Sequence, residues 1–249
     1  MQSIFERHEK KYLITKEQGE ALKKIISQYM EAARYGEYLV HNIYYDNEAW
    51  EVIRRSIEKP LYKEKMRLRS YDIPDKDSEV YLELKKKYNG IVYKRRAPVS
   101  YGDLIYRGAR DIMAEGNSQI LRELNFYMTK NLVTEKVYVA YNRTAYTGSD
   151  NWPGQRPGQG QGPLELRITF DADIRFRLDE LNFLNPDHGS LLLPKDTTVM
   201  EIKAQRGMPP GMPLWLARVL SDLKIFPRPF SKYGVCYTDF ILREEKLSA

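Results

Sequence analysis

The chain has 249 residues, of which 40 are Lys or Arg and 34 are Asp or Glu, so its formal net charge is 40 − 34 = +6. A hydrophobic content of 42% with 12% aromatic residues excludes wholesale disorder. The single cysteine, Cys236, excludes a disulfide framework and a zinc site built from several thiolates. The small positive excess favours an anionic partner only weakly, so the placement of the charges matters more than their sum.

No segment supplies the ~20 apolar residues that a membrane span needs, and the N-terminus lacks the apolar core of a signal peptide. The sequence therefore predicts no transmembrane segment and a cytoplasmic location. Similar strands precede and follow a Gly-, Pro- and Gln-rich stretch at 148–163. We interpret this stretch as a long flexible hairpin loop inside one domain that spans residues 1–249.

The hydrophobic pattern predicts an α+β chain in which strands outnumber helices. Thr15 followed by Gln18 is typical of a capping box that starts the first helix, and Asn89-Gly90 is a strong hairpin signal between two strands. Strands are predicted at residues 7–14, 39–45, 61–71, 79–88, 91–99, 135–146, 164–175 and 197–205. Helices are predicted at 16–29, at 47–58, after a cap at Asn117 to about 128, at 214–223 and at 235–242.

Most of these strands carry charge on one side and apolar residues on the other, because alternate residues of a strand point to the same side of a sheet. In a single strand this is the pattern of a solvated face. Its repetition on seven strands predicts that helices cover the apolar faces while the charged faces line the lumen of a barrel. The charged faces include Arg7, Glu9 and Lys11, then Lys63, Lys65, Arg67 and Arg69, then Glu83, Lys85 and Lys87, then Lys94 and Arg96, then Arg143, then Arg167 and Asp171, then Glu201 and Lys203.

The cations on these faces repel one another. Neighbours on one face lie ~7 Å apart, and two cations at that distance repel by ~0.6 kcal/mol in water and ~2.4 kcal/mol at an effective dielectric constant near 20. Several such pairs approach the ~5–15 kcal/mol stability of a domain. Interleaved carboxylates offset part of this repulsion, and a bound polyanion would offset the rest. Because Lys and Arg suit phosphates and carboxylates suit a hard divalent cation, the combination predicts triphosphate chemistry.

Eight charged motifs in order carry a resemblance to a known family. They are Arg7-x-Glu9-x-Lys11-Tyr12, Lys65-x-Arg67-x-Arg69, Glu83-x-Lys85, Lys94-x-Arg96, Tyr141-x-Arg143, Arg167, Glu201-x-Lys203 and Ser231-Lys232-Tyr233. The chain resembles the VTC domain, the polyphosphate-polymerase domain of the vacuolar transporter chaperone family, over about residues 5–240. That family also occurs as stand-alone bacterial proteins and belongs to the triphosphate tunnel metalloenzymes. The resemblance implies an antiparallel eight-stranded β-barrel tunnel with flanking helices.

The resemblance also implies roles for individual residues. Glu201 would hold Mn²⁺ or Mg²⁺, and Glu9 or Glu83 would assist. Related phosphatases carry Glu-x-Glu-x-Lys where this chain has Arg7-x-Glu9-x-Lys11, and the loss of one acid fits the polymerase branch better than a two-metal hydrolase. The implied catalytic cations are Arg67, Arg69, Arg143, Arg167 and Lys203. The further implied phosphate-binding residues are Arg7, Lys11, Lys65, Lys85, Lys94, Arg96, Tyr141, Ser231 and Lys232.

The implied reaction is transfer of the terminal phosphate of ATP, or of another nucleoside triphosphate, to a growing inorganic polyphosphate chain. Two alternatives stay open: a triphosphate hydrolase of the same fold, and a polyphosphate-binding module without turnover. No nucleic-acid partner is expected, because the sequence carries none of the RNA-binding motifs. Lys86 and Arg95 fall on the opposite face and are excluded from the site. The sequence gives no indication of whether the chain is a monomer or an oligomer.

Overall fold

The computed structural model describes residues 7–89, 91–148, 166–205 and 212–243. Its strands are β1 (Arg7–Thr15), β2 (Met30–Asp46), β3 (Tyr62–Tyr71), β4 (Glu79–Tyr88), β5 (Ile91–Ser100), β6 (Thr134–Gly148), β7 (Arg167–Arg177), β8 (Ser190–Leu191) and β9 (Thr197–Gln205). Its helices are α1 (Lys16–Ile26), α2 (Glu51–Ile57), α3 (Tyr101–Glu115), α4 (Gln119–Asn131), α5 (Leu214–Asp222), α6 (Lys232–Val235) and the π-helix η1 (Cys236–Ile241).

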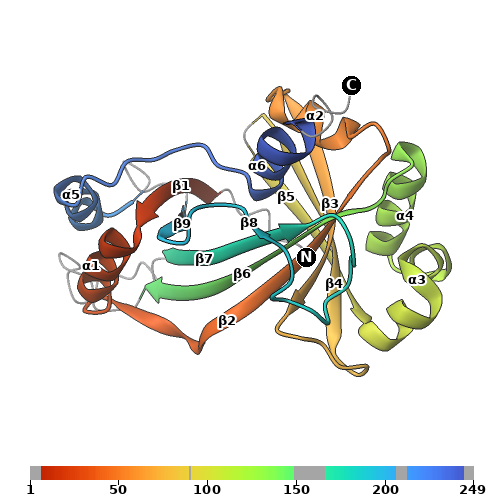
Figure 1. Ribbon diagram of the computed structural model, residues 1–249, viewed down its shortest axis with the longest axis horizontal. Helices are drawn as coiled ribbons and strands as arrows, with labels where there is room; N and C mark the ends of the chain where they lie inside the picture. The colour runs from red at the N-terminus through yellow and green to blue at the C-terminus, as the bar shows by residue number, and fades with distance from the viewer. Residues whose placement is uncertain (1–6, 90, 149–165, 206–211, 244–249) are drawn as a thin grey trace. The chain divides into compact units, whose positions relative to one another are not determined.

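The strands form one mostly antiparallel sheet in the order β1-β9-β7-β6-β2-β3-β4-β5, with β8 paired to β7 (Figure 1). The predicted α+β class, an antiparallel sheet with flanking helices, is confirmed. Among the described residues no pairing joins β1 to β5, so the sheet is open there and the predicted closed barrel is not confirmed. Within the same residues, no helix combines the length and the apolar character needed to cross a membrane.

The chain divides into two compact units, each built from three segments. Unit 1 comprises Met1–Tyr38, Asn142–Asp173 and Leu193–Phe230, and unit 2 comprises Leu39–Tyr141, Ile174–Leu192 and Ser231–Ala249. The strands β2, β6 and β7 each contribute residues to both units. The single domain expected over residues 1–249 stays a prediction.

In unit 2, the apolar positions of β3, β4 and β5 form a core with α3 and α4, which lie side by side (Figure 1). The register sets Met66 opposite Leu84 and Leu68 opposite Leu82, and all four are at most 2% exposed. Because side chains alternate along a strand, the intervening charged residues share the other face. The predicted division into an apolar, helix-covered face and a charged face is therefore confirmed in unit 2.

Unit 1 repeats this arrangement with its own core. Ile168 of β7, together with Met200 and Ile202 of β9, packs in one cluster with residues of α1 and α5 such as Leu22 and Leu216. The register pairs Ile168 with Ile202 across the two strands, so the charged residues between them face the other way. The two units therefore share one design, although their cores contain different residues.

Two local predictions, the capping box and the hairpin, are confirmed, and in both the interacting groups are close along the chain. Thr15 and Gln18 form the predicted capping box, with Thr15 Oγ1 accepting from Gln18 N at 3.2 Å and Gln18 Oε1 accepting from Thr15 N at 3.0 Å. Tyr88 pairs with Ile91, as a two-residue hairpin connection requires, and Asn89 adopts a φ of 44°. Gly90 lies outside the described residues, as does 149–165, most of the predicted loop at 148–163.

Two local predictions need correction, and one helix was not predicted. The cap of α4 is Ser118, whose Oγ accepts from Leu121 N at 3.1 Å, and not Asn117. The predicted helix at 235–242 is the short α6 continuing as the π-helix η1. The helix α3 was not predicted; Gly108, with a φ of 80°, lies inside it, and glycine is a poor helix former.

Candidate functional site

A buried carboxylate surrounded by four cations lies on the charged face of unit 2. Glu83 of β4 is 1% exposed, and the register places Arg67 of β3 and Arg96 of β5 directly opposite it on either side. Arg67 Nε donates to Glu83 Oε2 at 2.8 Å, and Arg96 Nε donates to Oε1 at 2.6 Å. Lys94 Nζ lies 2.7 Å from Oε1, and Arg69 Nε lies 4.0 Å from Oε2. We call these five residues the Glu83 cluster; its formal charge is 4 − 1 = +3.

The cations of the Glu83 cluster control its ionisation. Burial raises the pKa of Glu83, but Arg67, Arg69 and Lys94 together outweigh burial and hold that pKa well below its usual range. Burial lowers the pKa of Lys94 to about 8, with Glu83 opposing part of the shift. The Lys94 side chain stays 43% exposed, so an anion from solvent can reach its amino group. Glu83 is therefore ionised at neutral pH and acts as the shared counter-ion of the cluster.

Tyrosine and asparagine side chains fix the guanidinium groups around Glu83. Arg69 Nε donates to Asn42 Oδ1 at 2.9 Å, and Arg69 Nη2 lies 3.3 Å from the hydroxyl of Tyr141. Arg96 Nη2 donates to Tyr71 OH at 2.9 Å, and its guanidinium stacks 4.4 Å from the ring centre of Tyr81. Cations held in this way lose little conformational freedom when an anion binds.

The remaining predicted residues of unit 2 lie around the cluster. Lys85 is paired with both Lys65 and Lys94 in the register, which places three lysines in one row across the sheet. Lys65 Nζ donates to Ser231 Oγ at 3.3 Å, and Lys232 Nζ lies 4.2 Å from the ring centre of Tyr141. The structure thus brings together on one unit Lys65, Arg67, Arg69, Glu83, Lys85, Lys94, Arg96, Tyr141, Ser231 and Lys232.

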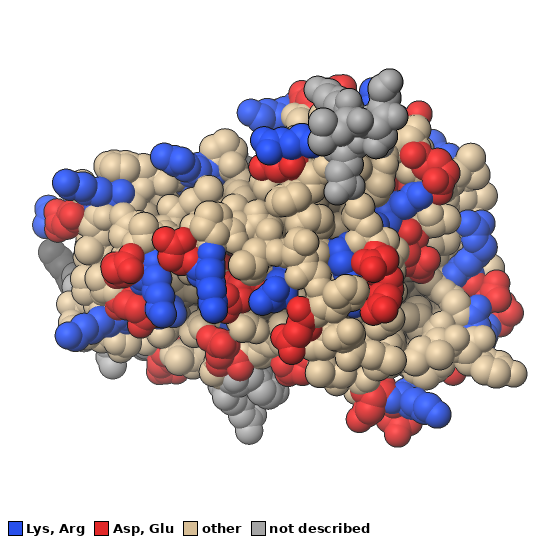
Figure 2. Space-filling view, viewed as in Figure 1, with Lys and Arg blue, Asp and Glu red and all other residues tan. Residues whose placement is uncertain are grey.

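Unit 1 carries a second charged constellation with a different balance. Glu9 of β1 is opposite Lys203 of β9, and Lys11 is opposite Glu201, so charges of opposite sign alternate across the two strands. Glu201 is 8% exposed, and its Oε1 lies 2.9 Å from Lys203 Nζ. Glu9 Oε1 lies 3.7 Å from Lys11 Nζ, which also donates to the carbonyl oxygen of Phe230 at 3.1 Å. Figure 2 shows basic and acidic side chains alternating over the region of β7 and β9.

Two predicted arginines extend this constellation. Arg143 forms a bidentate ion pair with Asp171, with Nε to Oδ1 at 2.7 Å and Nη2 to Oδ2 at 2.8 Å, and Asp171 is fully buried. Arg167 is exposed, lies opposite Lys203 in the register and has its Nη2 3.4 Å from Tyr38 OH. The side chain of Arg7 lies outside the described part of the structure, and its backbone pairs with Gln205.

Glu201 and Glu9 supply the hard oxygen donors that Mg²⁺ or Mn²⁺ prefers. Thr169 is paired with Glu201 in the register, and its buried Oγ1 has no hydrogen-bond partner within the described part of the chain. Among the described residues, however, no three His, Cys, Asp or Glu side chains come together as a metal centre. This donor set fits an ion that is held by one or two carboxylates and completes its shell with substrate phosphates and water. It does not fit a cage made of protein alone.

Sequence reasoning missed two carboxylates. Asp171 was recognised as part of a charged face but not as the partner of Arg143. Asp46 at the end of β2 was not singled out at all, although it is fully buried. Its position just before a predicted helix was a usable signal, because Asp often caps helix N-termini.

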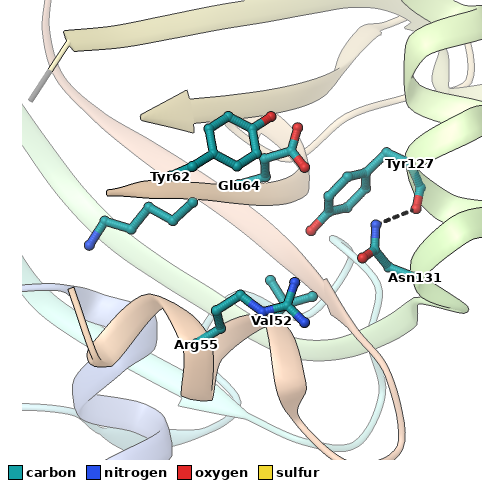
Figure 3. A pocket seen from close by; sticks show the side chains of 7 residues that line it. Val52, Arg55, Tyr62, Glu64, Tyr127 and Asn131 are labelled. Carbon is teal, nitrogen blue, oxygen red and sulfur yellow. Dashed lines mark hydrogen bonds between the residues drawn. The ribbon is translucent and has the colours of Figure 1, made fainter. Parts of the chain in front are cut away.

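A small cavity in unit 2 lies apart from the Glu83 cluster, between α2, α4 and the start of β3 (Figure 3). Arg55, Glu64, Tyr127 and Asn131 are among its lining residues, and its volume is about 40 Å³. A water molecule occupies ~30 Å³ in the liquid, so this cavity has room for roughly one water and not for a triphosphate.

Comparison with known families identifies the chain. The family model of the VTC domain matches residues 6–241. The chain therefore belongs to the VTC domain family, and the resemblance found in the sequence is confirmed. No curated protein matches the sequence.

Comparison with solved structures finds similar chains at low sequence identity. One is HpAC1 from Hippeastrum, a candidate adenylyl cyclase with a dominant triphosphatase activity, at 15% identity, a TM-score of 0.50, and 92% coverage of this chain and 94% of that chain. Another is a candidate adenylate cyclase from Bacillus halodurans, at 12% identity, a TM-score of 0.49 and coverages of 90% and 92%. At such identities the first likeness supports the fold alone.

Proposed function

We propose that this chain is a metal-dependent polyphosphate polymerase that transfers the terminal phosphate of ATP to a growing inorganic polyphosphate chain. The observation that carries the proposal is the Glu83 cluster, four cations around one buried carboxylate, in a chain of the VTC domain family. The Glu83 cluster has a formal charge of 4 − 1 = +3, which favours the binding of a multiply charged anion on this sheet face. ATP as the phosphate donor agrees with the cytoplasmic location expected from the sequence. The proposal also includes a closed eight-stranded tunnel that encloses the phosphate chain.

In this reaction the terminal oxygen of polyphosphate attacks the γ-phosphorus of ATP. A new P–O bond forms, the bond from the γ-phosphorus to the bridging oxygen breaks, and ADP leaves with that electron pair. Such a transfer needs positioning and charge stabilisation but no covalent enzyme intermediate. Arg67, Arg69 and Arg96 supply fixed guanidinium groups that donate to phosphate oxygens as their charge redistributes.

Glu201, assisted by Glu9, would hold Mn²⁺ or Mg²⁺, which would neutralise phosphate charge when bound. Lys11 and Lys203 alternate with these acids and would hold the phosphate oxygens that complete the metal shell. Three cations already contact the oxygens of Glu83. This arrangement favours a counter-ion role for Glu83 over the assisting metal role expected from the sequence.

The alternative with support is a triphosphate hydrolase of the same fold. The dominant triphosphatase activity of HpAC1 raises this possibility by analogy of fold. Against it stands Arg7, which occupies a position where related phosphatases carry an acid. A binding module without turnover is the third candidate.

Incubation of the purified chain with ATP and Mn²⁺, with and without a short polyphosphate primer, separates the three. A polymerase produces ADP and long chains on a gel, whereas a hydrolase releases orthophosphate without chains. A binding module does neither, although tripolyphosphate still raises its melting temperature by mass action. We expect the polymerase result, and either of the other results would overturn the proposal.

Variants connect the activity to the site. We expect Arg67→Ala and Glu201→Gln each to abolish turnover while the circular dichroism spectrum stays unchanged. Arg95→Ala is the matched control, because Arg95 is an arginine of β5 that points to the helix-covered face and pairs with Glu123 of α4 at 3.1 Å. Full activity in either of the first two variants contradicts the assignment.

A further inference from the structure

Asp46 connects three elements of unit 2. Its Oδ1 accepts from Asn47 N and Val52 N, each at 2.9 Å, and its Oδ2 accepts from Ile53 N at 2.9 Å. Trp50, the residue preceding α2, provides no side-chain cap, so Asp46 satisfies the amides of Val52 and Ile53 in the first turn of that helix, while Asn47 Oδ1 accepts from Glu51 N. A fourth hydrogen bond reaches Oδ2 from Tyr233 OH at 2.7 Å.

Tyr233 belongs to α6, the helix that begins after Ser231. It is 1% exposed, and its ring stacks on Tyr44 at 4.7 Å between centres and 20° between planes. The hydroxyl of Tyr44 in turn lies 3.5 Å from Arg67 Nη1. Burial and the neighbouring Asp46 carboxylate both raise the pKa of Tyr233, so the phenol keeps its proton and donates it to Asp46.

The two residues before Tyr233 are those that the family resemblance associates with phosphate. Ser231 Oγ accepts from Gly234 N at 3.2 Å and from Lys65 Nζ at 3.3 Å, while Lys232 lies over the ring of Tyr141. Lys65 Nζ is also 5.8 Å from the centre of the Tyr233 ring. The helix α6 has only four residues and continues as η1, whose side chains Cys236 and Ile241 are buried. These side chains hold the C-terminal part of the segment, and the Tyr233 hydroxyl connects its first turn to Asp46.

From these contacts we propose that Asp46 and Tyr233 are positioning residues for phosphate binding: their hydrogen bond holds Ser231 and Lys232 beside the Glu83 cluster. The inference rests on the proposed function for its consequence, which is tighter binding of the phosphate chain. Without the bond, Lys232 pays a larger ordering cost whenever an anion binds. The structural part of the inference, that the bond holds α6 in place, can be tested without any ligand.

Tyr233→Phe removes only the hydroxyl and retains the ring that stacks on Tyr44. Tyr45→Phe is the matched control, because Tyr45 is also 1% exposed and its hydroxyl donates to a carboxylate, Glu135 Oε1, at 2.8 Å, but on the helix-covered face of unit 2. Each variant loses one tyrosine–carboxylate hydrogen bond, but Asp46 is fully buried and Glu135 is exposed, so Tyr233→Phe should lose more stability. The control therefore serves for the local measurements below, which a uniform loss of stability would not confine to α6.

The first measurement is hydrogen exchange at Gly234 and Val235, whose amides donate to Ser231 Oγ and to the Ser231 carbonyl oxygen. We expect Tyr233→Phe to accelerate exchange there by about tenfold and Tyr45→Phe to leave it unchanged. Equal exchange in the two variants overturns the inference.

The second measurement is calorimetric titration with tripolyphosphate. We expect the Kd to rise by about fivefold in Tyr233→Phe and by less than about twofold in Tyr45→Phe. Lys232→Ala should weaken binding less in the Tyr233→Phe background than in the native chain, because both changes act on the same segment. Strict additivity overturns the inference. If the native chain itself does not bind tripolyphosphate, the proposed function fails, and the exchange measurement still decides whether Tyr233 anchors α6.

Discussion

The charged faces of the two units follow the same alternating pattern but differ in their balance of charge. In unit 2 the Glu83 cluster gathers four cations around one acid. In unit 1 the charged face has, among its described side chains, four cations and three acids, a formal balance of 4 − 3 = +1; the residues are Lys11, Arg143, Arg167 and Lys203 with Glu9, Asp171 and Glu201. A cationic excess binds anions, whereas a mixed face offers carboxylates to a metal ion and lysines to phosphate. Under the proposed function, one alternating pattern would therefore serve two chemical tasks.

The largest expected loss of stability comes from removing the buried ion pair of unit 1. Asp171→Ala leaves the guanidinium of Arg143, which is 9% exposed, without its bidentate partner. We expect the free energy of unfolding to fall by about 3–5 kcal/mol, the usual cost of removing one partner of a buried ion pair, as measured by urea denaturation. Glu180→Ala, at an exposed pair with His188, is the control and should cost little. Equal losses in the two variants would show that the pair is not structural.

Removing Glu83, the central acid of unit 2, should increase the difference in charge balance between the two units. Glu83→Gln raises the formal balance of that cluster from +3 to +4, so the cations repel more and stability falls by about 1–3 kcal/mol. Tripolyphosphate should then raise the melting temperature more than it does in the native chain, because the anion replaces the lost charge. Glu79→Gln, at the exposed start of β4, is the control. A smaller ligand effect in Glu83→Gln than in the native chain contradicts the counter-ion role.

Lowering the pH should reduce the stability of the protein through protonation of Glu83. The folded pKa of Glu83 is depressed, so its contribution to stability is fully present above its ordinary pKa of 4.5 and is lost as the pH falls toward the depressed value. We expect the native chain to lose stability below about pH 4.5 more steeply than Glu83→Gln. Urea denaturation at a series of pH values checks this, and parallel curves for the two chains contradict it.

Lys94 should make anion binding depend on pH in unit 2. Its amino group has a pKa of about 8, so it loses its proton as the pH rises through that value. Tripolyphosphate affinity should therefore fall by up to about tenfold per pH unit above pH 8, until the pKa of the complex is reached. Lys94→Arg keeps its charge and should flatten the profile. Identical profiles for the two chains would remove Lys94 from the site.

The smallest expected effect concerns the metal on the mixed face of unit 1. Because the described residues offer two carboxylates and no larger cluster, Mn²⁺ alone should raise the melting temperature by little. With tripolyphosphate present the same concentration should add a clear further rise, which Glu201→Gln removes. A strong effect of Mn²⁺ without phosphate would indicate a complete protein cage instead.

The sequence predicted much of the fold because most of its signals act over short distances. The capping box at Thr15 and the hairpin at Asn89 depend on neighbours in the chain, and the structure has both. The unpredicted helix α3 shows the opposite case, since packing against the unit 2 core stabilises a segment whose glycines weaken the local signal.

For the site, the local pattern of residues was enough to predict which side chains share a face, because the side-chain period of a strand is two whatever the strand pairs with. Which acid each cation contacts follows from the folded chain alone. Glu83 receives partners from β3 and β5, and Asp171 receives Arg143 from β6. Asp46 meets Tyr233 across 187 residues of sequence. Such pairings depend on strand register and helix docking, which burial of the whole core sets and which no local pattern encodes.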